Sequence, residues 1–374
     1  MIYLDNNATT QPAASVVDAM LPYLTACYFN ASTSTAAFTG ADRPRREAAA
    51  AMAKLLNAED PGCFTFTSGA TESNNWVFSS FAREHKAGRV LVSTVEHASI
   101  AEPAAELAVL GYDVVEVAVD AQGVIQLDAL CDALAEDTAL VSIMAANNET
   151  GVLEPIAEIG RLVRERSPNA LFHTDATQAV GKITVDLQGE WQDVDLLSFS
   201  AHKFRGPKGI GGLYLRPGIE ISPFHRGGAQ EDGRRGGTTN TAALAGMAAA
   251  ASLPNSAEVI RCVRDKLESG LKLAFPGIRI HSEGAVRLSN TTFFTIPGVV
   301  AEQCAQTLAA RGIVVGTGSA CSSSAMSPSK TLLAMGVDYD IARGALRVSL
   351  SQHTTIEEIE RFIAALSKIV ASHG

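Results

Sequence analysis

Short apolar segments alternate with helical patterns between residues 64 and 199, and this alternation limits the fold more than any other feature of the chain. Strands are expected at 64–67, 90–93, 114–117, 140–144, 171–173 and 194–199, and helices at 71–84, 99–110, 127–134 and 155–166. This pattern predicts a largely parallel sheet with helices on both faces. Ligands bind such sheets outside the carboxyl ends of the strands. Polar residues that directly follow the strands are therefore candidates for a functional site.

The pattern changes after Pro254, and the length of 374 residues also favours two domains. We expect a helix at 256–274, strands near 278–281 and 290–296, a helix at 301–310, a strand at 346–350 and a final helix. A strand at 2–4 and helices at 15–25 and 43–56 come first, and the Ser- and Thr-rich stretch 30–40 is expected to be a loop. The prediction is a large domain of residues 15–255 and a smaller α+β domain of residues 1–14 plus 256–374.

Charge and hydropathy exclude several classes of function. The net charge of −10 argues against a surface that binds nucleic acid stably, since such a surface needs a basic face. No apolar run reaches the roughly 18 residues that crossing a bilayer requires. The first residues lack the basic and apolar regions of a signal peptide. We expect a cytoplasmic protein without membrane contact.

The chain has six cysteines, and one of them stands apart. None forms a C-x-x-C pair, so neither a zinc site nor a dithiol motif is indicated, and no metal site is expected. Cys321 lies in a stretch of small residues, 316–329, which is expected to be a loop without a core-facing pattern. It is either an accessible reactive thiol or an inert one.

The stretch Ser198–Leu215 predicts a strand, a polar turn and a second strand. The turn holds two lysines, Lys203 and Lys208, next to Ser200 and His202. A lysine at the end of a buried strand is partly desolvated, which lowers its pKa and frees the amine to attack a carbonyl. The alternative is an ordinary basic turn on the surface.

Further polar residues follow other strands. A small-residue turn at 67–71 leads into a helix, where Ser68 and Thr71 either help to bind an anion such as phosphate or cap the helix. His97 is a candidate catalytic residue that stacks on a ligand ring or relays a proton, and the alternative is a structural role. The residues Asn147 and Asn148 also suit a plain turn.

Asp175 and Gln178 follow the strand at 171–173. The aspartate either pairs with a protonated ring nitrogen or caps a helix. Together these residues offer a lysine, an anion site, a flat polar side chain and a carboxylate at neighbouring strand ends. Pyridoxal 5′-phosphate requires this combination, because it binds through a lysine, a phosphate site and an acidic partner for its ring nitrogen.

Seven motifs of the chain resemble those of the cysteine desulfurases, in particular the branch with a long cysteine-bearing loop that serves nitrogen fixation and iron–sulfur clusters. They occur in the order of the family and the match extends from Tyr3 to Ser349. The motifs are TSGATES at 67–73, EH at 96–97, NNE at 147–149, HTDATQ at 173–178, SFSAHK at 198–203, GPKGIG at 206–211 and GSACS at 318–322.

This resemblance implies an α/β chain of the fold-type I pyridoxal-phosphate class, with a mostly parallel seven-stranded sheet in the large domain. It implies that Lys203 attaches the cofactor, that His97 stacks on the ring and that Asp175 pairs with its nitrogen. The other implied cofactor contacts are Ala70, Thr71, Asn148, Gln178, Ser200, His202 and, reaching the other subunit, Thr238. Arg347 is implied to hold the substrate carboxylate, with Asn30 and Asn148 as further candidates.

The resemblance also implies the reaction and the partners. L-cysteine would become L-alanine, while its sulfur passes to Cys321 as a persulfide and then to a sulfur-acceptor protein. The chain would act as a homodimer with a shared active site. The alternatives are a selenocysteine lyase, another enzyme of this fold, or a scaffold without activity. The presence of Lys203, Asp175, His97 and Cys321 argues against a scaffold.

Overall fold

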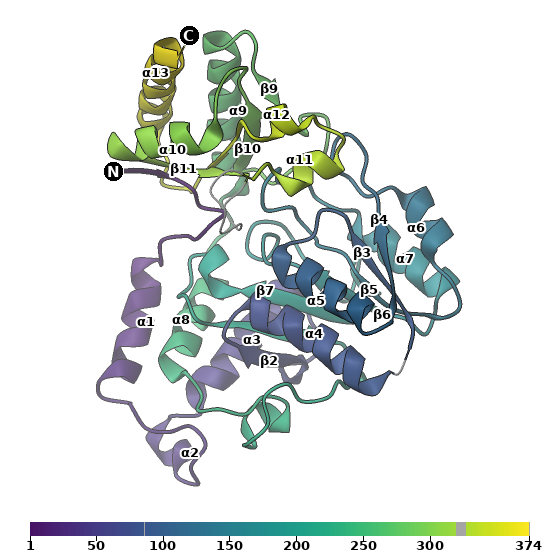
Figure 1. Cartoon of the computed structure of the whole chain (residues 1–374). Coiled ribbons are helices and arrows are strands. Elements are labelled where there is room, and N and C mark those ends of the chain that lie inside the picture. The colour runs from purple at the N-terminus through teal and green to yellow at the C-terminus, as the bar shows by residue number, and fades with distance from the viewer. Residues whose placement is uncertain (86, 319–326, 374) are drawn as a thin grey trace.

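The computed structural model describes residues 1–85, 87–318 and 327–373, and these residues form two β-sheets (Figure 1). The larger sheet has seven strands in the order β2-β8-β7-β6-β5-β3-β4. Strand β8 is antiparallel to both of its neighbours, and the other neighbouring pairs are parallel. The strands are β2 (Phe64–Thr67), β3 (Arg89–Ser93), β4 (Asp113–Val117), β5 (Thr138–Ser142), β6 (Leu171–Asp175), β7 (Leu196–Ser200) and β8 (Gly211–Leu215).

Helices cover both faces of this sheet because successive strand residues point to opposite sides. Val90 packs in a cluster with residues of α4 and α5, whereas Leu91 packs in a cluster with residues of α3, α6, α7 and α8. The helices are α1 (Ala14–Leu24), α3 (Arg43–Leu56), α4 (Ala70–Glu84), α5 (Ala98–Val109), α6 (Leu127–Ala133), α7 (Ile156–Arg166) and α8 (Thr241–Ala251).

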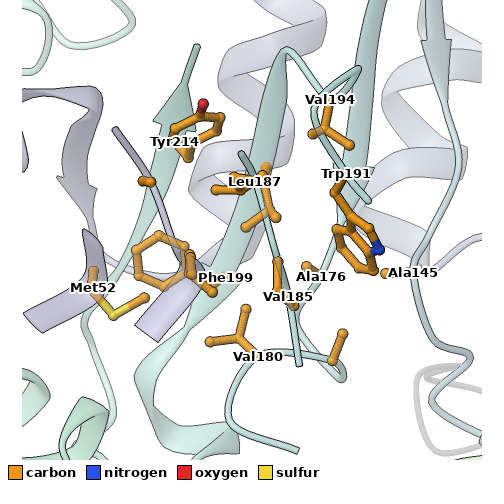
Figure 2. Close-up of a cluster of buried hydrophobic side chains, with 14 of the residues drawn as sticks. Met52, Ala145, Ala176, Val180, Val185, Leu187, Trp191, Val194, Phe199 and Tyr214 are labelled. Carbon is orange, nitrogen blue, oxygen red and sulfur yellow. The ribbon is translucent and has the colours of Figure 1, made fainter. Parts of the chain in front are cut away.

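The main core lies on the second of these faces. Figure 2 shows part of it, where Met52 of α3 lies near Phe199 of β7, and Val185, Leu187 and Trp191 come from the segment between β6 and β7. Met52 and Phe199 are fully buried. The burial of apolar surface in this core holds β6 and β7 in place, and both strands end at the candidate site.

The smaller sheet joins the two ends of the chain. Its order is β1-β11-β12-β10-β9, and β1 pairs parallel with β11 while the other pairs are antiparallel. Helices α9, α10 and α13 pack on it through a separate apolar cluster. The elements are β1 (Ile2–Leu4), β9 (Arg279–Ile280), β10 (Thr291–Thr295), β11 (Ile313–Thr317), β12 (Ala345–Ser349), α9 (Ala257–Ala274), α10 (Ala301–Ala310) and α13 (Ile356–His373), with the short helices α2 (Ala36–Thr39), α11 (Lys330–Ala334) and α12 (Tyr339–Ala342).

The predicted fold class is confirmed, with corrections to several elements. The expected loop 30–40 contains the short helix α2, and the expected loop 316–329 begins too early, because β11 continues to Thr317. Strand β6 extends beyond the predicted 171–173 to Asp175, since its polar last residues are still paired with β7. The domain boundaries stay a prediction. Among the helices of residues 1–85, 87–318 and 327–373, none combines the length and apolar character that spanning a bilayer requires.

We predict that Phe362→Ala destabilises the smaller sheet strongly. Phe362 of α13 is fully buried among residues of α9 and β12, so its removal leaves a cavity that costs about 3–5 kcal/mol. Leu273→Ala on α9 is the matched control, because Leu273 is 87% exposed and its loss should cost less than about 0.5 kcal/mol. Urea unfolding of both variants measures the difference, and equal stabilities would contradict the packing described.

Candidate active site

Four parallel strands, β3, β5, β6 and β7, deliver polar side chains to the same edge of the larger sheet. A cavity of about 310 Å³ lies there, a size that suits a small-molecule ligand. The predicted site residues that line it are Ala70, Thr71, His97, Asn148, Asp175, Gln178, Ser200, His202, Lys203 and Arg347. Within the described part of the chain, Asn30 and Thr238 lie outside this lining at exposed positions. Cys321 lies outside the described residues.

The turn between β2 and α4 forms one end of the cavity. The first amide of α4, Ala70 N–H, donates to Ser200 Oγ over 2.7 Å, which ties this helix end to the end of β7. A Cβ atom on Gly211 would lie 2.3 Å from the carbonyl oxygen of Phe199 and 2.7 Å from the Cα atom of Gly69. The backbone at 211 can approach those at 69 and 199 this closely only because positions 69 and 211 are glycines.

The capping alternative for this turn is wrong. The N-cap of α4 is Gly69, which has no side chain, so neither Ser68 nor Thr71 occupies that position. Instead Glu72 orders the turn by accepting from Ser68 N–H over 2.8 Å and from Arg235 Nε over 2.8 Å. Burial raises the pKa of Glu72, but these hydrogen bonds outweigh it and leave the pKa below its usual value. An ordered helix end with its amides toward the cavity favours the anion-binding alternative.

Hydrogen bonds among residues of α4, α5 and β6 position the carboxylate of Asp175. Asn74 Nδ2 donates to Asp175 Oδ2 and to Ser99 Oγ, each over 2.8 Å. Ser99 N–H donates to His97 Nδ1 over 3.1 Å, which makes His97 the N-cap of α5 as well as a cavity residue. Asp175 is the last residue of β6 and accepts from Thr177 N–H, so it does not open a helix.

Sequence reasoning missed Asn74. It is fully buried on α4, a position where an apolar residue is usual, and this burial is the signal that the sequence alone does not show. Its partner Asp175 is also buried. A buried carboxylate that accepts two hydrogen bonds is held in one orientation.

The structure separates the two lysines of the turn. Lys203 closes a short 3₁₀ helix and lines the cavity, and its Nζ donates to the carbonyl oxygens of Asn7 over 2.5 Å and Ala8 over 3.0 Å. Lys208 is exposed. Burial, together with Lys203 and Lys208, lowers the pKa of His202 to about 4. His202 is therefore uncharged at neutral pH.

Arg347 of β12 brings the smaller sheet into the site. Its guanidinium donates to Asp5 over 2.7 Å and to the carbonyl oxygen of Asn148 over 2.9 Å. The buried Nε has no hydrogen-bond partner among the described residues. A buried arginine with unused donor capacity suits a carboxylate ligand.

Glu149 contacts residues on both sides of the segment that holds Cys321. It accepts from Ser329 Oγ over 2.5 Å and from Thr331 Oγ1 over 3.1 Å. A Cβ atom on Gly318 would lie 3.2 Å from its Oε2 atom. Glu149 directly follows the cavity residue Asn148, so its contacts place the described residues Gly318 and Ser329 near one residue of the cavity lining.

Comparison with known proteins identifies the family. The aminotransferase class-V family matches residues 2–362. A cysteine desulfurase of Trichormus variabilis is 41% identical, covering 99% of this chain and 93% of the relative. The chain belongs to the cysteine desulfurases.

Solved structures agree with this family. A NifS-like protein superposes with a TM-score of 0.92 at 36% identity, covering 99% of both chains. A structure of SspA in complex with cysteine superposes with a TM-score of 0.84 at 30% identity, covering 95% of this chain and 100% of the other. Cysteine desulfurases depend on pyridoxal phosphate, and cysteine desulfurase activity follows for this chain from relatives that match nearly its whole length.

The cavity of this cysteine desulfurase fits the cofactor of its family. A helix N-terminus faces one end, a carboxylate held by Asn74 faces another, and the amine of Lys203 enters from the edge of the sheet. The backbones at Gly69, Phe199 and Gly211 crowd together beside the first turn of α4, and a helix N-terminus favours an anion such as phosphate.

Glu96, in the Glu-His motif of this desulfurase, is an unusual neighbour of the site. Its Oε1 atom accepts from Ser93 Oγ over 2.7 Å and from Met144 N–H over 2.8 Å, while Oε2 has no partner among the described residues. Burial raises the pKa of this carboxyl to about 8, and the charge of Asp175 adds to the effect. Glu96 is therefore protonated at neutral pH, when it can donate rather than only accept.

We predict that Glu96→Gln keeps the fold and removes a loss of stability at high pH. The pKa of Glu96 is about 8 in the folded protein against 4.5 for a glutamate in water, so the folded state binds the proton more tightly. Its contribution to stability is present below about pH 4.5 and is lost as pH rises through 8. Gln retains an acceptor and never ionises. Urea unfolding across this pH range should show that the free energy of unfolding of the variant rises relative to that of the parent as pH rises. The same pH dependence of stability in both proteins would contradict this.

Proposed function

We propose that the cavity binds pyridoxal 5′-phosphate and that the residues around it convert L-cysteine to L-alanine with sulfur passing to Cys321. One observation carries this proposal: ten residues implied as a cofactor and substrate site, from motifs far apart in the chain, line one cavity. When bound, the cofactor supplies an aldehyde that condenses with amines and a ring that withdraws electrons from the substrate.

Each part of the cavity has a role in holding the cofactor. The amides at the start of α4, with Thr71, Ser200 and His202, would bind the phosphate. Uncharged His202 would act there as a hydrogen-bond donor or acceptor, since its pKa is about 4. Asp175, oriented by Asn74, would pair with the protonated ring nitrogen, and His97 would stack on the ring.

The substrate contacts come from the other sheet. Arg347 would hold the carboxylate of L-cysteine, with Asn148 beside it and Asn30 as a further candidate, and the unused Nε donor of Arg347 supports this role. The structural relative SspA was solved in complex with cysteine, which supports an amino-acid site in this fold. Lys203 would attach the cofactor and move the proton at the substrate Cα atom.

Cys321 would accept the sulfur. Its thiolate attacks the sulfur of L-cysteine, an S–S bond forms and the Cβ–S bond breaks, and the electron pair of that bond stays with carbon, which takes up protons. The balance is L-cysteine plus the Cys321 thiol giving L-alanine plus the Cys321 persulfide. The position of Gly318 and Ser329 beside Glu149, at the cavity, supports this assignment.

The partners follow from the same proposal. A second copy of the chain would form a homodimer with a shared active site, in which exposed Thr238 reaches the phosphate of the other subunit. Arg235, held by Glu72 at the phosphate turn, lies three residues before Thr238 and supports this position. The persulfide would pass to a sulfur-acceptor protein, such as one for iron–sulfur clusters, in the cytoplasm.

We predict that Lys203→Ala and Cys321→Ala fail in different ways. Lys203→Ala should lose both the near-visible absorbance of the attached cofactor and the release of alanine from L-cysteine. Cys321→Ala should keep the absorbance but lose at least about 90% of alanine release, because the acceptor thiol is gone. Cys262→Ala, at an exposed cysteine on α9, is the matched control and should match the parent. Undiminished alanine release by Cys321→Ala would overturn the role of that thiol.

We predict that Arg347→Met raises the KM for L-cysteine by about tenfold or more, because a charge-assisted hydrogen bond to the substrate carboxylate is worth about 1.5–3 kcal/mol. Steady-state alanine release gives KM and kcat separately. Arg287→Met controls for the loss of a buried arginine, since Arg287 pairs with Glu268 away from the cavity lining. An unchanged KM in Arg347→Met would exclude this residue as the carboxylate site.

A further inference from the structure

Lys182 is a partly buried lysine that none of the motifs above includes. Its Nζ donates to Gln178 Oε1 over 2.5 Å and to Asn7 Oδ1 over 3.1 Å. Both partners are neutral amides, whereas a buried lysine usually pairs with a carboxylate. Both partners also line the cofactor cavity. The placement of this charge therefore needs an explanation other than a structural ion pair.

The contact with Lys182 determines which way the amide of Gln178 faces. Lys182 Nζ donates to Gln178 Oε1, so the carbonyl oxygen of that amide faces Lys182. The amide nitrogen then points the other way, where it donates to the carbonyl oxygen of Asn7 over 2.9 Å. An amide nitrogen carries two N–H groups, so the second is available to an acceptor in the cavity.

The same contact reaches Lys203 through Asn7. The carbonyl oxygen of Asn7 accepts from Lys203 Nζ over 2.5 Å and from Gln178 Nε2, while the side-chain oxygen accepts from Lys182. Asn7 is fully buried, and its amide nitrogen donates to Thr291 Oγ1 over 2.8 Å. Lys182 thus contacts the side-chain oxygen of Asn7 directly, together with Asn290 Nδ2 at 2.9 Å, and reaches its backbone carbonyl oxygen through Gln178.

Lys182 also interacts electrostatically with charged residues of the site. Burial lowers the pKa of Lys182 well below its usual value, and the charges of Lys203 and Arg347 lower it further. The charges of Lys182 and Lys203 therefore repel each other.

We propose that Lys182 is a positioning residue for the active site, which holds Gln178 with an N–H group toward the cavity and holds Asn7 beneath the amine of Lys203. The inference rests on the proposed function, because it takes Lys203 as the lysine that attaches the cofactor. The acceptor that the free N–H group of Gln178 would meet is an anionic oxygen on the cofactor ring.

Lys182→Met tests this inference, since methionine keeps an apolar side chain of similar length but neither donates nor carries charge. Lys182 also borders a second cavity of about 290 Å³, which leaves room for the substituted side chain. Losing the N–H donor to the ring oxygen and losing the nearby charge both favour protonation of the Lys203–cofactor linkage. The midpoint of the pH-dependent absorbance change should therefore rise by about one pH unit. Affinity of the cofactor-free protein for pyridoxal phosphate should fall about tenfold.

Lys208→Met is the matched control. Lys208 is exposed, yet its charge also lowers the pKa of His202, so this variant removes a lysine charge near the site without touching Gln178 or Asn7. Its midpoint should move by less than half as much as that of Lys182→Met. The other titratable groups lining the two cavities remain in both variants: the N-terminal amine of Met1, Tyr3, His97, Asp175, His202, Lys203, Arg205, Arg347, His353 and Glu358.

Gln178→Met provides the second measurement and stands on its own if Lys182→Met does not fold. It should raise the midpoint, and the double variant should shift it by clearly less than the sum of the two single shifts, because Lys182 acts through Gln178. Midpoints of Lys182→Met and Gln178→Met equal to that of the parent, or fully additive shifts, would overturn the inference. A parent protein with no cofactor absorbance and no alanine release would instead refute the proposed function.

Discussion

The backbone carbonyl of Asn7 accepts hydrogen bonds from both Lys203 and Gln178, and the site depends on this one oxygen. The N-terminal strand that precedes Asn7 belongs to the smaller sheet, whereas Lys203 and Gln178 follow strands of the larger one. The amine therefore takes its position from a segment of the other sheet. This explains why a chain of two sheets forms one site, which neither sheet could complete alone.

Burial near the site keeps three titratable groups, His173, His202 and Glu96, uncharged at neutral pH. Burial lowers the pKa of His173, which lies between Ser142 and Ser198, to about 4, and a similar effect holds His202 neutral. Burial raises the pKa of Glu96 to about 8. Asp175 and Arg347 are each held by a polar partner: Asn74 donates to Asp175, and Arg347 donates to Asp5. Burial also strengthens the electrostatic interactions among the buried groups at the site.

Much of the fold and part of the site could be predicted from the sequence. The physical reasons for this also explain which residues could not be predicted. Strand–helix alternation is a local signal, so the parallel sheet and helices such as α3 and α10 were predictable, and Lys203 stood out at the end of a strand. Asn7, Asn74 and Lys182 gave no such signal, because polar residues near helices and turns are usually exposed. Only tertiary packing shows that they are buried around Gln178 and Asp175. Strand β11 was missed because small residues at its end resemble a loop.

The central claim is that sulfur leaves the substrate through a thiol of the chain itself. The most direct measurement is the mass of the cysteine-containing peptides after the protein has reacted with L-cysteine and been alkylated without reductant. The account predicts one additional sulfur atom on the peptide with Cys321, absent in Lys203→Ala, and none on the peptide with the exposed Cys262. Alanine release from the parent protein with no extra sulfur on Cys321 would contradict it.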